Sequence, residues 1–259
     1  TVRAHSREVS TSSAATTQSG FLLNRPEPGK IAKRVPRAPR YSVIGRRPER
    51  CFSALVMYDF HSYVFRKNPQ AAVDAFRRAM QGRKDAVLVI KTINSKMHAK
   101  DYAKLKKDVA GLNVVFVDEF LTRAQVYQLQ ACCDVRLSLH RAEGFGLAPA
   151  EMMFMGKPVI ATGWSGNMDF MTPMNSYPVE YDLKPLRKAV GAYDEGPLWA
   201  EPDIDHAAWC LTQIIEKNSD AMAKAKRGAA DVRRLLSPKV VGAQVRERLN
   251  LIARMRGID

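Results

Sequence analysis

Two glutamates, Glu143 and Glu151, stand eight positions apart in the run LHRAEGFGLAPAEMMFMGKPVIAT, residues 139–162. Between them, Gly144 and Gly146 supply the backbone freedom that a strand needs to turn into a helix, and Pro149 suits the first turn of that helix. Free N–H groups and the positive end of the dipole at a helix start attract an anionic oxygen. A carboxylate beside such a site repels phosphate but accepts hydrogen bonds from hydroxyls. The run therefore predicts a ligand with both sugar hydroxyls and phosphates, such as a sugar nucleotide.

A second explanation stays open when this spacing is taken alone. A glycine-rich turn between a strand and a helix is also common as a plain connection, and such glutamate pairs occur by chance. In that case Glu143 caps the start of the helix and Glu151 is an exposed helix residue. His140 and Arg141 directly precede the motif and can shape the same pocket. A single histidine at a strand end more often has a structural role.

The segments that position this run alternate between short apolar stretches and amphipathic ones from Cys51 onward. The pattern predicts strands at residues 52–58, 86–91, 114–117, 135–139 and 158–161. It predicts helices at residues 69–81, 99–110, 122–133 and 148–155, the first with Asn68 as N-cap and Pro69 at its first position. Strands separated by helices form right-handed crossovers in a parallel sheet. We therefore expect an α/β, Rossmann-like parallel sheet flanked by helices, with Glu143 at the C-terminal edge, where such sheets bind ligands.

Three further helices are predicted in the last third of the chain, at residues 204–217, 220–236 and 239–254. Each has apolar residues at helical spacing with charges on the opposite face, so we expect its leucine and methionine side chains to pack in the core. Together they form a helical C-terminal extension of the sheet. No internal repeat of about 20 to 50 residues is present, which disfavours a repeat solenoid.

Several motifs, in order along the chain, resemble the retaining glycosyltransferases of family 4 (glycosyl transferases group 1), which have the GT-B fold. The run from Glu143 to Glu151 is similar to their E-x7-E signature, and MGKPVIAT at residues 155–162 follows it as in that family. FRKNP at residues 65–69, WSGNMDF at 164–170 and WAEPD at 199–203 resemble further elements of these enzymes. The resemblance covers about residues 52–255 and implies the C-terminal, donor-binding half of a GT-B enzyme.

The resemblance implies roles for the matched residues. Lys67 and Arg66 would neutralise the diphosphate as the sugar departs, which is electrostatic stabilisation of a leaving group. Glu143 would contact the donor sugar, and Glu151 would accept hydrogen bonds from the ribose. The remaining candidates for the donor site are His140, Gly144, Phe145, Gly146, Leu147, Gly166 and Asn167. Without the downstream motif, solubility alone would explain an Arg-Lys pair at a helix start.

The reaction that the resemblance implies is transfer of a hexosyl group from a nucleoside-diphosphate sugar to a hydroxyl acceptor, with the anomeric configuration retained. The acceptor would be a glycan, a lipid-linked sugar or another hydroxyl compound. The sequence has no DxD-like pair, so we expect no metal ion and no cofactor besides the donor substrate. One departure concerns residues 58–62, YDFHS, where the family often has a glycine and an arginine. This departure affects the second phosphate contact, and some members carry an Asp-Phe-x-Ser form, as this chain does at residues 59–62.

Residues 1–50 differ in composition from the rest of the chain, with eleven Lys or Arg, three Glu and five Pro. We interpret them as a basic, flexible tail or linker with one strand near residues 41–44, and residues 51–259 as the nucleotide-sugar-binding domain. A solvated charge run explains the tail, and attraction to an anionic membrane surface is the alternative. The net charge of +15 also makes nucleic-acid binding a candidate function. We disfavour that function because the remaining chain lacks a clustered basic and aromatic motif.

The length of 259 residues and the apolar content of 46% allow one or two domains with a full core. No apolar stretch approaches the roughly 18 residues that span a bilayer. Cys51, Cys132, Cys133 and Cys210 fit neither a zinc site nor a disulfide framework, so we expect buried thiols and a cytoplasmic protein, with a peripheral position at a membrane surface left open.

The chain holds only the donor half of a GT-B enzyme and begins with Thr. We therefore expect a fragment or a processed form, whose acceptor domain lies in a longer parent chain or in a partner. The alternative function is a noncatalytic nucleotide-sugar-binding or scaffold module.

Overall fold

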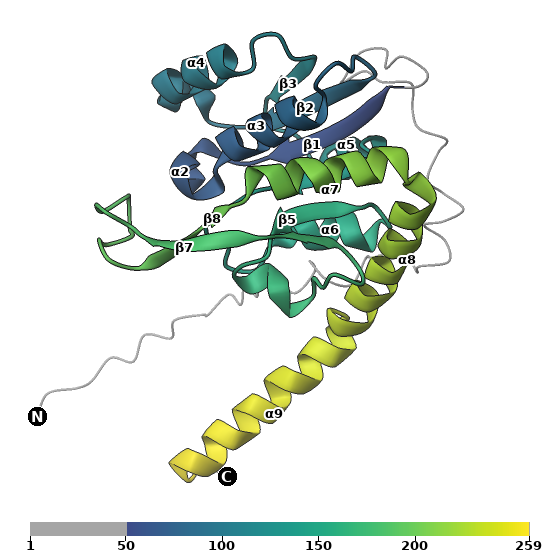
Figure 1. The fold of residues 1–259 in the computed structure, drawn as a ribbon. Coiled ribbons are helices and arrows are strands. Elements are labelled where there is room, and N and C mark those ends of the chain that lie inside the picture. The colour runs from purple at the N-terminus through teal and green to yellow at the C-terminus, as the bar shows by residue number, and fades with distance from the viewer. Residues whose placement is uncertain (1–50, 259) are drawn as a thin grey trace, which may run out of the picture. The chain divides into compact units, whose positions relative to one another are not determined.

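The computed structural model describes residues 51–258, which form a six-stranded parallel sheet flanked by helices (Figure 1). The expected strand at residues 41–44 lies outside the described residues. The strands are β1 Phe52–Met57, β2 Ala86–Thr92, β3 Val114–Asp118, β4 Val135–Ser138, β5 Val159–Thr162 and β6 Tyr177–Val179. Their order in the sheet is β3-β2-β1-β4-β5-β6, and β1 pairs in parallel with both β2 and β4. This confirms the Rossmann-like fold expected from the sequence.

Helices cover both faces of the sheet. On one face lie α3 Pro69–Ala79, α4 Ala99–Asp108 and α7 Ile204–Glu216, and on the other lie α5 Arg123–Cys132, α6 Leu147–Phe154 and α8 Asn218–Leu235. The predicted strands and helices differ from these bounds by at most two residues at either end. Each face has its own buried apolar cluster, as expected for a parallel sheet covered on both sides.

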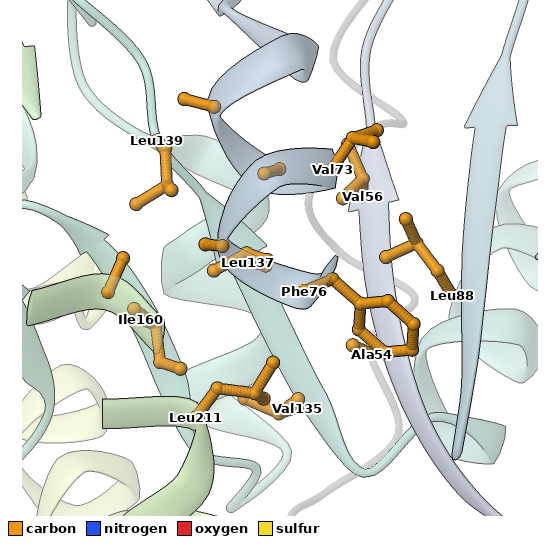
Figure 2. Close-up of a cluster of buried hydrophobic side chains, with 14 of the residues drawn as sticks. Ala54, Val56, Val73, Phe76, Leu88, Val135, Leu137, Leu139, Ile160 and Leu211 are labelled. Carbon is orange, nitrogen blue, oxygen red and sulfur yellow. The ribbon is translucent and has the colours of Figure 1, made fainter. Parts of the chain in front are cut away.

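The larger cluster lies between the sheet and helices α3 and α7. Val73 and Phe76 of α3 and Leu211 of α7 pack against the strands around Val135 and Leu137, as Figure 2 shows. All five side chains are at most 1% exposed. Burial of a side chain as large as Phe76 contributes roughly 2–3 kcal/mol. The apolar spacing of α3 and the uninterrupted apolar strands together fix this helix on the sheet.

The turn before α3 places the Arg66 and Lys67 pair. These residues do not open α3; they end a separate short helix, α2 Val64–Lys67, and the chain then reverses at Asn68 with φ +49°. Pro69 takes the first position of α3 as predicted. Asn68 holds the N-cap position, but its side chain forms no capping hydrogen bond. A left-handed asparagine thus separates the two helices and lets the basic pair face away from α3.

Several short elements were not predicted. A two-stranded antiparallel hairpin consists of β7 Tyr181–Pro185 and β8 Leu198–Pro202, and β6 adds an edge strand to the main sheet. Three 3₁₀ turns occupy η1 Phe60–Ser62, η2 Ser95–His98 and η3 Gly166–Asp169. These segments are too short to show a clear apolar period, so local pattern does not reveal them.

The last helix, α9 Pro238–Arg256, corrects one expectation. We predicted that its apolar residues would pack in the core, but α9 has no buried residue. Val241, Leu249 and Met255 are 40%, 59% and 76% exposed. In Figure 1 the helix runs away from the sheet. Helical spacing of apolar residues fixes which side chains share a face, but it does not provide a surface for that face to pack on.

Candidate functional site

A cavity of about 220 Å³ lies at the C-terminal edge of the sheet, where β1 and β4 are neighbours and the strand order reverses. The residues that line it come from the ends of these strands and from α2, α3, α5, α6 and the turn before α6: Val56, Met57, Tyr58, Lys67, Ala72, Arg123, Val126, Arg136, Leu137, Ser138, Leu139, Glu143, Leu147, Ala148, Pro149 and Glu151. Open α/β sheets bind their ligands at such a reversal. The cavity therefore contains both glutamates of the motif and one residue of the basic pair.

Lys67 and Glu143 form an ion pair at this cavity. The Lys67 ammonium donates a hydrogen bond to the Glu143 carboxylate, and their side chains are 21% and 15% exposed. Arg66 lies beside the pair, with its Nη1 atom 3.9 Å from Glu143 Oε2. The same Nη1 donates to the carbonyl oxygen of Ala142 at 2.9 Å. The fold thus joins the basic pair to the start of the glutamate motif across 76 positions of sequence.

Burial and charge act in opposite directions on this pair. Burial lowers the pKa of the Lys67 ammonium, and the neighbouring Glu143 carboxylate partly offsets that effect. Burial would raise the pKa of Glu143, but the charge and hydrogen bond of Lys67, with the nearby His140 and Arg66, bring it below its ordinary value. Glu143 is therefore ionised at neutral pH beside a cationic partner. A partly dehydrated ammonium of this kind forms strong hydrogen bonds with phosphate oxygens.

Glu151 projects into the same cavity from helix α6. Its carboxylate accepts hydrogen bonds from Arg123 Nη1 at 2.9 Å and from Gln130 Nε2 at 3.0 Å. The Glu151 side chain is only 14% exposed, so it is not the exposed helix residue of the alternative explanation. The two partners hold its carboxylate in a fixed orientation, ready to accept hydrogen bonds from hydroxyl groups.

Two glycine-rich loops pack directly against each other beside the cavity. The Gly166 amide donates to the Glu143 carbonyl at 3.1 Å, and the Glu143 amide donates to Ser165 Oγ at 3.1 Å. A Cβ atom on Gly166 would lie 2.0 Å from the carbonyl oxygen of Gly144. Gly146 has φ +84° and forms the N-cap of α6. The glycines at 146 and 166 therefore meet two different needs, a left-handed turn and a close approach.

His140 and Asn167 connect these two loops inside the protein, and both residues are 0% exposed. His140 Nε2 lies 3.2 Å from the Trp164 carbonyl and 3.1 Å from Asn167 Oδ1, while Nδ1 lies 3.3 Å from Ser138 Oγ. Both partners of Nε2 are acceptors, so Nε2 carries the proton. Burial lowers the pKa of His140, which keeps its ring neutral. Neither His140 nor Asn167 lines the cavity.

The remaining candidates lie around the entrance to α6. Leu147 lines the cavity and is 55% exposed, while Phe145 is 41% exposed and its ring lies 5.4 Å from that of Phe170. Gly144 is exposed, and a Cβ atom there would meet nothing within 4 Å. The backbone of this turn is therefore accessible, as the donor-site prediction requires.

Three polar residues of the site were missed in the sequence: Arg123 and Gln130, which hold Glu151, and Arg136, which lines the cavity from β4. Arg136 carried a usable signal, because a charged residue inside an apolar strand is rarely buried without a partner or a function. Arg123 and Gln130 carried no such signal, because polar residues on one face of a helix are common in proteins.

Other sequence expectations concern metals, thiols and membranes. Within residues 51–258, no group of three His, Cys, Asp or Glu is arranged to hold a metal ion. Cys51, Cys133 and Cys210 are buried, as expected, whereas Cys132 is only partly buried, which corrects the expectation for that residue. In the same part of the chain, no helix combines the length and the apolar content needed to cross a membrane.

A parallel sheet with a cavity at its strand-order reversal defines a Rossmann-like ligand-binding domain. Residues 56–176 match the family described as glycosyl transferases group 1. The chain shares the fold of one half of solved GT-B glycosyltransferases. Among curated protein sequences, none matches this chain significantly.

Solved structures with the same fold include Alr3699/HepE of Anabaena, determined in complex with UDP and glucose. It is 18% identical, with a TM-score of 0.58, and the match covers 78% of this chain and 48% of that one. The C-terminal domain of a glycosyl transferase group 1 protein (LpcC) from Francisella tularensis is 17% identical, with a TM-score of 0.53, covering 72% and 86%. Sucrose-phosphate synthase from Thermosynechococcus elongatus is 16% identical, with a TM-score of 0.58, covering 81% and 47%. The chain thus spans about half the length of the Anabaena protein.

Proposed function

We propose that this chain is the donor-binding half of a retaining glycosyltransferase, which transfers a hexosyl group from a nucleoside-diphosphate sugar to a hydroxyl acceptor. The observation that carries the proposal is the meeting of Lys67, Glu143 and Glu151 around one cavity at the reversal of strand order. Two further facts support it. Residues 56–176 match the glycosyl transferases group 1 family, and the Anabaena protein of the same fold was crystallised with UDP-glucose.

In this proposal Lys67 binds the diphosphate and stabilises its negative charge as the bond to the sugar breaks. Arg66 and the free amides of Leu147 and Ala148 at the start of α6 add positive potential, and Pro149 has no N–H to offer. Because these groups neutralise the leaving diphosphate, the reaction needs no metal ion or other cofactor.

The two glutamates take different parts of the donor. Glu151, held by Arg123 and Gln130, accepts hydrogen bonds from the ribose hydroxyls. Glu143 exchanges part of its contact with Lys67 for hydroxyls of the transferred sugar. His140 and Asn167 hold the loop that carries Gly166 against the start of the motif, so they orient the donor site through the backbone.

The acceptor, whether a glycan, a lipid-linked sugar or another hydroxyl compound, would bind a second domain that a longer parent protein or a partner supplies. The match covers only 48% of the Anabaena protein and 47% of the sucrose-phosphate synthase, which motivates that part of the proposal. We therefore expect the chain alone to bind the donor without turnover. A noncatalytic nucleotide-sugar-binding module would bind the same ligands and would show no transfer even when the second domain is added.

The test is calorimetric titration of the full chain with UDP, GDP and ADP, repeated for Glu151→Ala and Lys67→Ala. We expect one nucleotide to bind and each substitution to weaken binding about tenfold or more, since each removes hydrogen bonds to or from a charged group. Glu216→Ala and Lys104→Ala are matched controls, because both residues are exposed and lie outside the cavity. A folded chain that binds none of the three nucleotides would argue against the donor site, and equal losses in the controls would show a general charge effect.

A further inference from the structure

Arg136 lies within the parallel sheet, on β4, and is only 3% exposed. The backbone of β4 pairs with β1 on one side and β5 on the other. The Nη2 atom of Arg136 donates to the carbonyl oxygen of Met57 at 2.9 Å. The Nε and Nη1 atoms are buried and have no hydrogen-bond partner among the described residues. The guanidinium therefore keeps two donor nitrogens whose hydrogen bonds the described protein does not supply.

A buried guanidinium with unpaired N–H donors destabilises the folded state unless a ligand accepts its hydrogen bonds. Buried N–H donors without partners weaken the folded state, and native proteins leave few of them without a functional reason. Burial lowers the pKa of Arg136 to about 10, with the charges of Glu143 and Glu151 opposing that effect. The side chain therefore remains cationic at neutral pH.

Arg141 shows the hydrogen bonding of a structural arginine in this domain. Its Nε and Nη2 atoms bind both carboxylate oxygens of Glu201, at 2.7 and 2.9 Å, and its Nη1 donates to the Phe65 carbonyl at 2.7 Å. All three nitrogens of Arg141 have protein acceptors, whereas among the described residues only one of the three nitrogens of Arg136 has one.

The position of Arg136 relates it to the diphosphate contact proposed for Lys67. It lines the same cavity as Lys67, and its guanidinium reaches the end of β1, where residues 58–62 begin. Lys67, Arg123 and Arg136 together give the cavity more positive than negative charge, even with Glu143 and Glu151 in its lining.

We propose that Arg136 is a second donor-binding residue, which contacts the diphosphate from the floor of the cavity together with Lys67. The inference rests on the proposed function, because it assigns part of the same donor site. It predicts that the contribution of Arg136 depends on the phosphates of the ligand and is absent for the nucleoside.

The experiment compares the nucleotide that binds best with its nucleoside, for example UDP with uridine, on the full chain and on Arg136→Met. We expect Arg136→Met to weaken binding of the diphosphate about tenfold to a hundredfold and to change binding of the nucleoside by less than about twofold. Lys91→Met is the matched control. Lys91 is a buried cation at the same sheet edge that donates to the carbonyls of Thr92 and Glu119 and lies outside the cavity.

Thermal unfolding of the same variants separates ligand binding from folding. Replacement of an unpaired buried charge by methionine should leave the melting temperature equal or higher. Arg136→Lys, which keeps the charge, should recover part of the diphosphate affinity. A lower melting temperature with equal loss for nucleoside and diphosphate would overturn the inference, and so would unchanged diphosphate binding by Arg136→Met.

If the proposed function is wrong, the titrations give a different pattern of binding. If the unsubstituted chain binds none of the nucleotides, the donor-site proposal falls, and titration with inorganic pyrophosphate then decides the role of Arg136. Pyrophosphate binding that Arg136→Met loses and Lys91→Met keeps would still support an anion contact. No pyrophosphate binding by the folded chain would overturn it.

Discussion

The His140 ring is closed off from solvent, with acceptors at Nε2 and the Ser138 hydroxyl at Nδ1. This arrangement joins the end of β4 to the loop around Asn167. His140, which the sequence suggested as a residue of the nucleotide-sugar site, thus supports that site from inside the protein.

This placement predicts a pH dependence of stability. Burial holds the pKa of His140 below 6.5, so as the pH falls below that value the unfolded chain takes up a proton before the folded one. The stability that neutral His140 contributes is complete above pH 6.5 and is lost as the pH falls toward the lowered folded-state pKa, by up to about 1.4 kcal/mol per pH unit. Denaturant unfolding from pH 8 to pH 5 measures the effect.

His140→Gln should unfold at lower denaturant concentration at pH 8 but lose less stability on acidification. His61→Gln is the control, because His61 is exposed. Parallel pH profiles for the unsubstituted chain and His140→Gln would contradict the buried neutral ring.

At the scale of elements, the start of α6 and the turn η3 form one unit, because their backbones touch. Gly166 is the contact point, and an alanine there would place its Cβ 2.0 Å from the Gly144 carbonyl oxygen. A collision with backbone cannot be relieved by a change of rotamer, so the two loops would have to separate.

We expect Gly166→Ala to lower the free energy of unfolding by about 1–3 kcal/mol, as overpacking does. Gly144→Ala is a matched control with the same chemical change, because its Cβ would meet nothing within 4 Å and its φ is not positive. It should stay within about 0.5 kcal/mol of the unsubstituted chain. Urea titration of both variants gives the comparison, and equal stability losses would show that the loops are not in close contact.

At the scale of the whole molecule, the helices after the sheet contribute unequally. Helix α8 buries Ala221, Ala225, Ala229 and Val232, whereas α9 buries nothing. Stability depends on buried apolar area, so removal of α8 should lower the free energy of unfolding more than removal of α9.

We predict that truncation after Ser237, which removes α9, changes the melting temperature by no more than about 2 °C and leaves nucleotide affinity unchanged. Truncation after Lys217 also removes α8 and should prevent cooperative folding, which makes it the matched control. Thermal unfolding followed by circular dichroism distinguishes them. A large loss of stability on removal of α9 alone would mean that its apolar face packs on the domain in solution.

The sequence by itself determined the parallel sheet, the order of its main elements along the chain and the identity of the motif residues. These features are local: alternating apolar segments, the glycines at 144 and 146, and Pro69 and Pro149 all act through neighbouring backbone. For the same reason the predicted elements lie within two residues of those in the structure.

Only the tertiary structure decided which of these residues meet. Lys67 and Glu143 are paired across 76 positions, Glu151 is held by Arg123 and Gln130, and α9 is left exposed. Arg136 lies in the sequence as one charge in an apolar strand, and only the structure shows that its Nε and Nη1 atoms are buried without a partner among the described residues. Contacts between distant segments depend on strand order and packing, and no local period of the sequence encodes those.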